Sequence, residues 1–346
     1  MPSPVGARLR RPAALLATLC LTAPLAACGS PSSRPANDAA ATAGFPVTVE
    51  NCGHDVTEAA PPQRIVAINQ PATELLLSLG LADRMAGYGV SDHDFLPGLE
   101  AQARRTKALD AEFPGFEAML SLEPDLVYAT FAYAFTGEGV APRAQFDEVG
   151  IPTYQSPSEC GGQDAPHDEP LTLDDLYAEI GDVSRLTGVE ERGEQLVAEL
   201  RERARTVTVD LDADDVTLGW WYASTKSPYM AGCCGAPGLM TRAVGATNAF
   251  GDNERLWPET SWESILDADP TVLVLADLER GGDGDSAEAK IRFLESDPVA
   301  RQLTAVKKRR YVVLGGTTMD PSIRNVDGIE QLAQGLRDLG VVPDGR

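Results

Sequence analysis

Short runs of consecutive apolar residues alternate along this chain with segments whose apolar residues recur every three or four positions. Three runs, "RIVAIN" from Arg64, "DLVYATF" from Asp125 and "TVLVLAD" from Thr271, are typical of strands buried on both faces of a parallel sheet. The segment "ATELLLSLGLADRM" from Ala72 carries leucines at helical spacing and follows the first run closely. Strands that alternate with helices predict an α/β fold with mainly parallel sheets.

The remaining pattern extends this scheme over two regions. We expect further strands at "FPVTVENCG", "MAGYGV", "IPTYQS", "VTLGWWY" and "RRYVVLGG", and further helices at residues 238–244, 288–294 and 322–339. Between the regions, residues 171–208 form an amphipathic stretch rich in opposite charges four positions apart, which predicts one long helix. The chain is therefore expected to contain two α/β lobes, residues 45–170 and 209–346, joined by this single helix.

The first 27 residues form a separate segment. Three arginines near its start precede an apolar stretch, residues 12–23, that is too short to span a bilayer permanently, which predicts an export signal at residues 1–27. The small residues ahead of Cys28 resemble the lipobox at which bacterial lipoproteins are cleaved and acylated; the alternative is an ordinary secretory signal. Residues 28–44 are small and polar and are expected to form a disordered tether. We therefore expect an extracytoplasmic protein, lipid-anchored to the cell membrane.

Size and charge narrow the function classes. The 346 residues are 43% hydrophobic, which is enough for two cores of ordinary size. Asp and Glu total 52 against 29 Lys and Arg, so the folded part should repel nucleic acid and anionic membrane surfaces. The sequence downstream of the export signal contains no second apolar span. We expect a monomer that binds no nucleic acid and reaches the membrane only through its anchor.

Cysteine usage agrees with an oxidising, extracytoplasmic setting. After removal of the signal and lipidation of Cys28, four cysteines remain: Cys52, Cys160, Cys233 and Cys234. Four thiols allow three pairings. We favour one disulfide between the first two, which flank the N-terminal lobe, and one between the adjacent last two, which lie in a glycine-rich loop. The competing interpretation of the adjacent pair is a metal site.

One motif occurs twice, as "GFEAMLSLEPDLVYATF" and "SWESILDADPTVLVLAD". Each copy has a glutamate, Glu117 or Glu263, followed seven positions later by a proline and then by an apolar run. The matched spacing favours duplication of a functional unit, one per lobe. The alternative is that helix–turn–strand units often look alike, and that both glutamates merely suit the first turn of a helix.

The motif and its surroundings resemble the substrate-binding proteins of bacterial ABC importers for iron–siderophore complexes, haem and cobalamin. The resemblance covers most of the mature chain and is carried by "PQRIVAINQPATELLLSLGLADRMAGYG", "FEAMLSLEPDLVYA", "SWESILDADPTVLVL" and "RRYVVL…IRNVDGIEQLAQGL". It implies two α/β lobes joined by one long helix, a ligand between the lobes, and a dimeric ABC permease as partner. By the same resemblance, Glu117 and Glu263 match the glutamates that pair with permease arginines.

The resemblance also implies a ligand site at loops after strand ends, where open parallel sheets generally bind ligands. The candidate ligand-binding residues are Asn69, Gln70, Tyr88, His93, Tyr133, Trp221, Tyr222, Tyr229 and Arg324. Aromatic and amide groups suit a bulky, partly planar ligand. Arg324 is expected to neutralise a carboxylate or phosphate on the ligand; the alternative is a salt bridge within the last helix.

These features favour a carrier that captures an iron–siderophore, a similar metal chelate or a corrinoid and delivers it to an ABC permease. A direct zinc or manganese binder needs ligands from both lobes, and the three histidines all precede residue 171. No GxSxG, phosphate-loop or HExxH motif is present, so we expect no enzyme and no cofactor. Two alternatives stay open: the same carrier role for a non-iron cofactor precursor, and a membrane-anchored enzyme or sensor.

Overall fold

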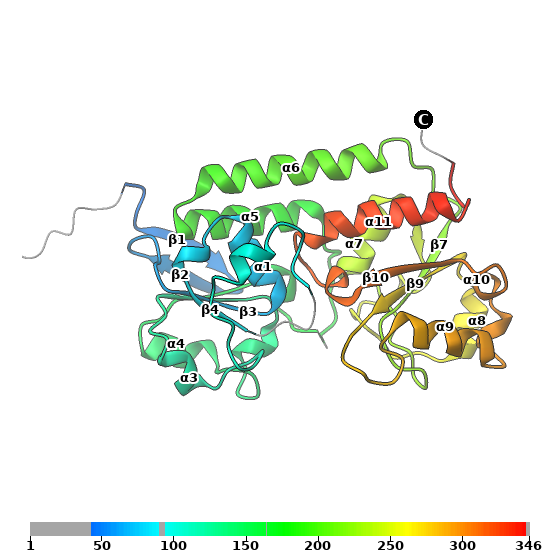
Figure 1. Cartoon of the computed structure of the whole chain (residues 1–346), viewed down its shortest axis with the longest axis horizontal. Helices are drawn as coiled ribbons and strands as arrows, with labels where there is room; N and C mark the ends of the chain where they lie inside the picture. The colour runs from blue at the N-terminus through cyan, green and yellow to red at the C-terminus, as the bar shows by residue number, and fades with distance from the viewer. Residues whose placement is uncertain (1–42, 90–93, 164, 344–346) are drawn as a thin grey trace, which may run out of the picture. The chain divides into compact units, whose positions relative to one another are not determined.

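The computed structural model describes residues 43–89, 94–163 and 165–343, which form a β-hairpin and two four-stranded sheets (Figure 1). The hairpin strands are β1 (Val47–Asn51) and β2 (His54–Glu58). The first sheet comprises β3 (Ile65–Ile68), β4 (Met85–Tyr88), β5 (Leu126–Ala129) and β6 (Thr153–Gln155). The second comprises β7 (Thr217–Trp221), β8 (Thr247–Asn248), β9 (Val272–Asp277) and β10 (Tyr311–Gly315).

Both sheets are parallel, and both have the same strand order. The first runs β4-β3-β5-β6 and the second β8-β7-β9-β10. We call the elements around the first sheet the N-terminal lobe and those around the second the C-terminal lobe. The predicted α/β class with two lobes and parallel sheets is confirmed. The continuous apolar runs fall on the central strands, whose residues are almost all buried.

Helices surround both sheets. In the N-terminal lobe they are α1 (Gln70–Ser78), α2 (Glu100–Ala103), α3 (Phe116–Leu120) and α4 (Arg143–Glu148). Two long helices follow, α5 (Leu173–Thr187) and α6 (Glu190–Thr208). In the C-terminal lobe they are α7 (Ala236–Ala243), α8 (Trp262–Ala268), α9 (Ala287–Ser296), α10 (Thr304–Lys307) and α11 (Arg324–Asp338).

The prediction of one long helix over residues 171–208 is wrong, because this stretch forms α5 and α6, which pack against each other. Helix α5 ends at Gly188, whose φ of 67° lies in the left-handed region that favours glycine. The backbone N–H of Val189 then donates to the carbonyl of Ser184, which completes a Schellman motif. The amphipathic pattern continues through the turn, and this continuity concealed the break.

Helix α5 belongs to both cores. Ile180 and Val183 pack in the N-terminal core with the residues of β3 and α1, whereas Leu176 packs in the C-terminal core. The chain reaches α5 through a loop that already contacts the C-terminal lobe, since the backbone N–H of Leu171 donates to the carbonyl of Cys234. The lobes are therefore joined by this loop, by α5 and by α6.

The repeated motif folds into two matched units. In each, a short helix, α3 or α8, leads to a strand that lies beside the first strand of its sheet. Met119 and Ile265, at equivalent positions, are completely buried. Glu123 and Asp269, also equivalent, have φ values of 49° and 37°. The two lobes thus repeat one structural plan down to the backbone conformation ahead of the strand.

The hairpin was predicted only as a single edge strand. Its turn consists of Cys52 and Gly53, which have φ values of 52° and 76°, as a two-residue hairpin turn requires. A disulfide joins Cys52 to Cys160, and the Asn51 side chain exchanges two hydrogen bonds with the backbone of Gln155 in β6. The hairpin is thereby fixed to the edge of the first sheet.

Several predictions at the N-terminus lie outside the described residues: the export signal at 1–27, lipidation of Cys28 and all but the last two residues of the tether. Within the described part, none of the helices combines the length and apolar character needed to cross a bilayer.

Candidate functional site

Polar and aromatic residues of the N-terminal lobe gather where its strands end. Asn69 follows β3 with a φ of 76°, which is uncommon for a residue other than glycine. Its side-chain amide donates to Glu112 Oε1 at 2.8 Å, and its carbonyl oxygen accepts from the Phe131 N–H at 3.5 Å. Asn69 itself is 1% exposed. The constrained asparagine at the end of β3 therefore links the segment between β4 and α3 to the loop after β5.

Two aromatic rings lie at the same end of the N-terminal lobe. Tyr133 belongs to a short 3₁₀ turn after β5 and is 46% exposed, which is unusual for so large a ring. Phe113 contacts it edge to face, with 5.1 Å between ring centroids. The Tyr133 hydroxyl donates to the carbonyl of Glu138. This pair presents apolar surface beside the carboxylate of Glu112.

The C-terminal lobe contributes a second aromatic group. Tyr222 directly follows β7, is half-buried, and packs against Trp257 with 4.7 Å between centroids. The Arg280 guanidinium carbon lies 5.3 Å from the centroid of the Tyr222 ring, within cation–π range. Arg280 also pairs with Asp285 at 2.9 Å. Tyr222 is therefore held by its contacts with Trp257 and Arg280 and stays partly exposed.

The carboxylates of Asp320 and Glu112 belong to opposite lobes and interact electrostatically. Asp320 follows β10 and is half-buried; burial raises its pKa to about 7, and repulsion from Glu112 adds to the increase. Arg324 and Arg280 act in the opposite direction. Burial also raises the pKa of Tyr222, and repulsion from Asp320 contributes. Glu112 of the N-terminal lobe therefore contributes to the electrostatic environment of both Asp320 and Tyr222 of the C-terminal lobe.

Behind these groups lie two buried carboxyl groups of the N-terminal lobe. Burial raises the pKa of Glu179 to about 7, although the hydroxyls of Tyr128 and Ser156 donate to its carboxylate at 2.6 and 2.8 Å. Burial and repulsion from Asp320 raise the pKa of Glu159 to about 8. Among the described residues, Glu159 Oε2 has no hydrogen-bond partner. These carboxyls are too buried to contact a ligand directly.

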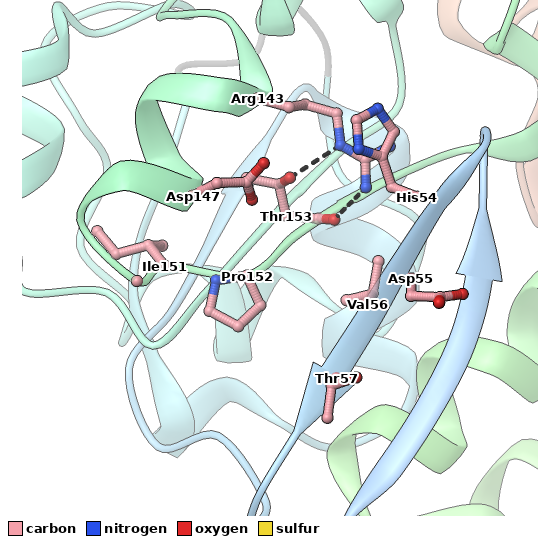
Figure 2. Close-up of a pocket in the computed structure, with 10 residues that line it drawn as sticks. His54, Asp55, Val56, Thr57, Arg143, Asp147, Ile151, Pro152 and Thr153 are labelled. Carbon is pink, nitrogen blue, oxygen red and sulfur yellow. Dashed lines mark hydrogen bonds between the residues drawn. The ribbon is translucent and has the colours of Figure 1, made fainter.

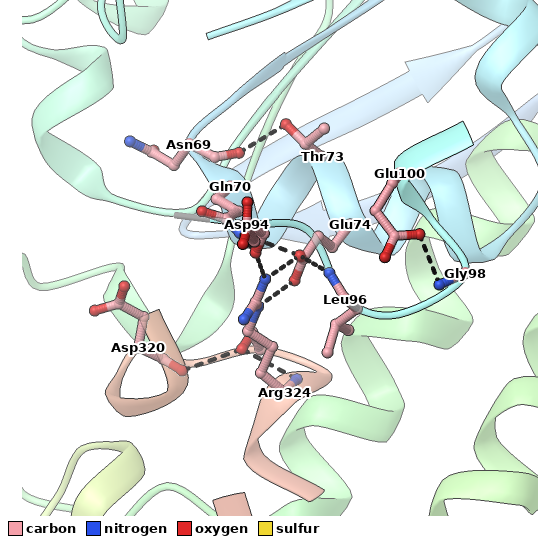
Figure 3. Close-up of polar contacts among 11 residues, drawn as sticks. Asn69, Gln70, Thr73, Glu74, Asp94, Leu96, Gly98, Glu100, Asp320 and Arg324 are labelled. Atoms are coloured by element: carbon pink, nitrogen blue, oxygen red, sulfur yellow. Dashed lines mark hydrogen bonds and ion pairs between the residues drawn. The ribbon is translucent and has the colours of Figure 1, made fainter. Parts of the chain in front are cut away.

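Arg324 differs from the expectation. It pairs with Glu74 of α1, so it is neither free to neutralise a ligand nor bridged within the last helix (Figure 3). Gln70 is 5% exposed, and its amide donates to Glu74 and to the carbonyl of Asp94. Both residues are therefore occupied by contacts within the protein.

Of the four other predicted ligand residues, the structure describes three. Trp221 is completely buried between Trp262 and Phe293, which is a packing role. Tyr88 is 8% exposed and belongs to the N-terminal core. Tyr229 is half-buried, and its hydroxyl donates to Glu259. His93 lies outside the described residues.

Glu117 and Glu263 are both exposed, each as the second residue of its helix. The N-cap of α8 is Ser261, whose hydroxyl accepts from the Ser264 N–H, whereas Gly115 gives α3 no side-chain cap. The two remaining disulfide candidates, Cys233 and Cys234, are bonded to each other in the loop before α7.

A separate cavity of about 380 Å³ lies between the hairpin, α4 and β6 (Figure 2). Arg143 lines it, but its guanidinium donates to Thr153 Oγ1 and to the carbonyls of Thr153 and Asn51. This arginine holds the hairpin against the sheet, so the cavity is a by-product of that attachment. Elsewhere in the described ranges, His, Cys, Asp and Glu side chains form no group of three suited to a metal ion.

Sequence reasoning missed Glu112, Phe113, Trp257 and Arg280. All four lie in long loops after strands, where apolar periodicity gives no information. Their common signal was position alone, since each lies in the segment that follows a predicted strand, but so do many surface residues.

Two parallel α/β lobes with aromatic and charged side chains in the loops after their strands are typical of a two-lobed binding protein. The chain belongs to the periplasmic binding protein family, whose profile matches residues 65–318.

Known proteins similar to this chain include transport components. YvrC of Bacillus subtilis, described as an uncharacterized ABC transporter substrate-binding lipoprotein, is 24% identical over 95% of this chain and 98% of its own length. A vitamin B12-binding protein of Vibrio cholerae is 22% identical over 80% of this chain and 90% of its own.

Two solved structures share the fold. A periplasmic binding protein of Veillonella parvula superposes with a TM-score of 0.75 at 21% identity, over 84% of this chain and 97% of its own. A protein of an ABC-type Fe3+-hydroxamate transport system from Saccharomonospora viridis superposes with a TM-score of 0.69 at 27% identity, over 84% and 99%.

Proposed function

We propose that this protein is an extracytoplasmic, lipid-anchored carrier that captures a bulky metal chelate or corrinoid between its lobes and delivers it to an ABC permease. The observation that carries the proposal is the electrostatic interaction of Glu112 of the N-terminal lobe with Tyr222 and Asp320, which follow strands of the C-terminal lobe. Family membership and the lipoprotein relative support the transport role and the anchor at Cys28. The ligand residues are Asn69 as support, and Glu112, Tyr133, Tyr222, Arg280 and Asp320 as contacts.

The ligand class follows from what the site offers. Aromatic faces at Tyr133 and Tyr222 suit a large, partly apolar ligand, and Glu112 and Asp320 suit hydrogen-bond donors on its periphery. A ferric hydroxamate or a corrinoid brings its own metal ligands, so the protein need supply none. The similar B12-binding protein and the Fe3+-hydroxamate structure agree with this class.

Delivery is proposed to use the matched glutamates. Glu117 and Glu263 are exposed at the same position of two equivalent units, one in each lobe. A dimeric permease presents two equal sockets, and arginines there would form charge-assisted hydrogen bonds with the two carboxylates. Such contacts set orientation and encounter rate more than affinity.

Binding is tested by tryptophan fluorescence titration of the purified protein with three probes: a ferric trihydroxamate, cyanocobalamin and haem. At least one should bind, and Tyr222→Ala should weaken that binding by about tenfold or more, since a stacked ring at the centre of a site contributes most. The matched control is Tyr311→Ala, because Tyr311 is half-buried like Tyr222 but lies at the amino end of β10. Equal losses in both variants, or no binding of any probe, would contradict the proposal.

A further inference from the structure

The least exposed ion pair among the described residues joins the two lobes. Glu74 of α1 has a side chain that is 0% exposed, and Arg324, the first residue of α11, one that is 12% exposed. Arg324 Nε donates to Glu74 Oε2 at 2.6 Å, and its Nη2 donates to Glu74 Oε1 (Figure 3). The two residues are 250 positions apart in the chain. This bidentate contact therefore fixes the position of α11 relative to α1.

The same two side chains hold a third segment. The Leu96 N–H donates to Glu74 Oε1 at 2.9 Å, and Arg324 Nη2 donates to the carbonyl of Asp94 at 2.6 Å. Gln70 bonds both Glu74 and the Asp94 carbonyl, at 3.2 and 2.9 Å. Figure 3 shows these groups converging on one point between α1 and the start of α11. Asp94 and Leu96 are thus tied to both lobes through one carboxylate and one guanidinium.

The pair stabilises neither helix α11 nor, on balance, the folded protein. An arginine at the first position of a helix lies at the positive end of the helix dipole, which is unfavourable for a cation. A buried ion pair contributes little net stability, because the desolvation of two charges offsets their attraction. What a bidentate, buried pair does provide is fixed geometry.

Other contacts between the lobes constrain their relative orientation less. Arg203 of α6 pairs with Asp327 and Glu330 of α11, but all three side chains are about one-quarter to one-third exposed, so water and salt weaken the interaction. Helix α5 joins the cores by apolar packing, and Ile323 and Val326 at the start of α11 pack in the N-terminal core, but apolar contacts are not directional. The buried pair lies on the α1 side of the interface and so resists rotation of one lobe against the other about α5 and α6.

We propose that Glu74 and Arg324 are positioning residues that form an inter-lobe latch, which sets the orientation of the lobes before any ligand binds. The latch holds the strand ends bearing Asp320 and Glu112 at their mutual distance. It also sets the spacing between Glu117 and Glu263. Only these two consequences rest on the proposed function; the orientation of the lobes is measurable without ligand or permease.

The test measures the distance between two spin labels on the full chain purified in detergent. Ala118→Cys and Ser264→Cys place the labels at exposed, equivalent positions on α3 and α8. Arg324→Gln and Glu74→Gln should each broaden the distance distribution from double electron–electron resonance by about twofold, because the orientation of the lobes is then set only by α5, by α6 and by the apolar packing of Ile323 and Val326. Unchanged distributions in both variants would overturn the latch.

The control for a general loss of stability is Arg143→Gln. Arg143 is also a buried arginine with several hydrogen bonds, but all its partners lie in the N-terminal lobe. This variant should leave the distance distribution narrow, and equal broadening here would assign the effect to destabilisation. If the single latch variants do not fold, Glu74→Leu with Arg324→Met removes both charges together and leaves neither uncompensated. That double variant should fold and give the broad distribution; a narrow one would overturn the latch.

Binding provides the second readout. For whichever probe the protein binds, Arg324→Gln should raise the dissociation rate several-fold and leave the association rate nearly unchanged, since the contacts to the ligand persist but the lobes no longer hold it. A direct ligand contact at Arg324 would instead lower affinity without broadening the distance distribution. If no probe binds, the proposed ligand class fails while the distance measurement still decides the latch.

Discussion

Glu117 and Glu263 occupy equivalent positions in two units that share a short helix, a residue with positive φ and an adjoining parallel strand. Neither carboxylate has a hydrogen-bond or ion-pair partner among the described residues. Two unengaged, exposed charges at matched positions of two lobes are suited to a partner with matching symmetry.

Charge reversal tests this relationship directly. The double variant Glu117→Lys, Glu263→Lys should abolish uptake of the ligand by cells, because lysine would repel the arginines proposed for the permease, while affinity in solution stays within about twofold of the original. Uptake of radiolabelled ligand and fluorescence titration measure the two quantities. Glu199→Lys, an exposed glutamate on α6, is the control and should transport normally. Normal uptake by the double variant would refute docking through these residues.

The disulfide between Cys52 and Cys160 is expected to stabilise the N-terminal lobe. It spans 108 residues, and replacing both cysteines by serine should lower the free energy of unfolding by about 2–4 kcal/mol. Chemical denaturation measures the loss. Cys233→Ser with Cys234→Ser is the control: this disulfide joins neighbours, so it restricts the unfolded chain very little. Equal losses from the two pairs would contradict the argument.

The central strands were predictable because each is buried on both faces, which requires continuous apolar sequence. The break between α5 and α6 at Gly188 could not be predicted in the same way. The amphipathic pattern of α5 continues into α6, so the sequence resembles one uninterrupted helix. Only the left-handed conformation of the glycine distinguishes two helices from one there.

The location of a ligand site at the strand ends stays a prediction, and the structure shows that several of the residues predicted for it are engaged elsewhere. Trp221 and Tyr222 are neighbours at the end of β7, and adjacent strand residues face opposite ways, so one is buried in the core and the other is half-buried beside Asp320. Sequence alone could not decide which. Arg324 could not be matched to Glu74 because their contact depends on how the two lobes meet.

The charge of the preferred ligand can be tested with two forms of one probe. A linear ferric trihydroxamate with a free terminal ammonium should bind about five- to tenfold more tightly than the same complex N-acetylated, because Glu112 and Asp320 are proposed ligand contacts while Arg280 is paired with Asp285. Asp320→Asn should narrow this difference. Asp215→Asn, an exposed aspartate in the loop before β7, should not. Tighter binding of the acetylated form would exclude a preference for cationic ligands.

Stability should decrease as pH rises from about 5 to 8, the reverse of the usual trend. Burial raises the pKa of Glu58 and Glu159 to about 8 and that of Glu179 to about 7, from an ordinary value of 4.5. The folded state then binds protons more tightly than the unfolded state, and the stability present below pH 4.5 is lost as pH rises through each folded-state pKa. Lys290, whose pKa burial lowers to about 8, changes stability only above this window.

Thermal unfolding at pH 5, 6, 7 and 8 measures this dependence. The melting temperature should fall across the series, and Glu159→Gln should reduce the slope because an amide in the buried position needs no proton to be neutral. Glu199→Gln replaces an exposed carboxylate and should leave the slope unchanged. A melting temperature that rises steadily from pH 5 to 8 would mean that these carboxyls are ionised in the folded protein, compensated by partners other than those described.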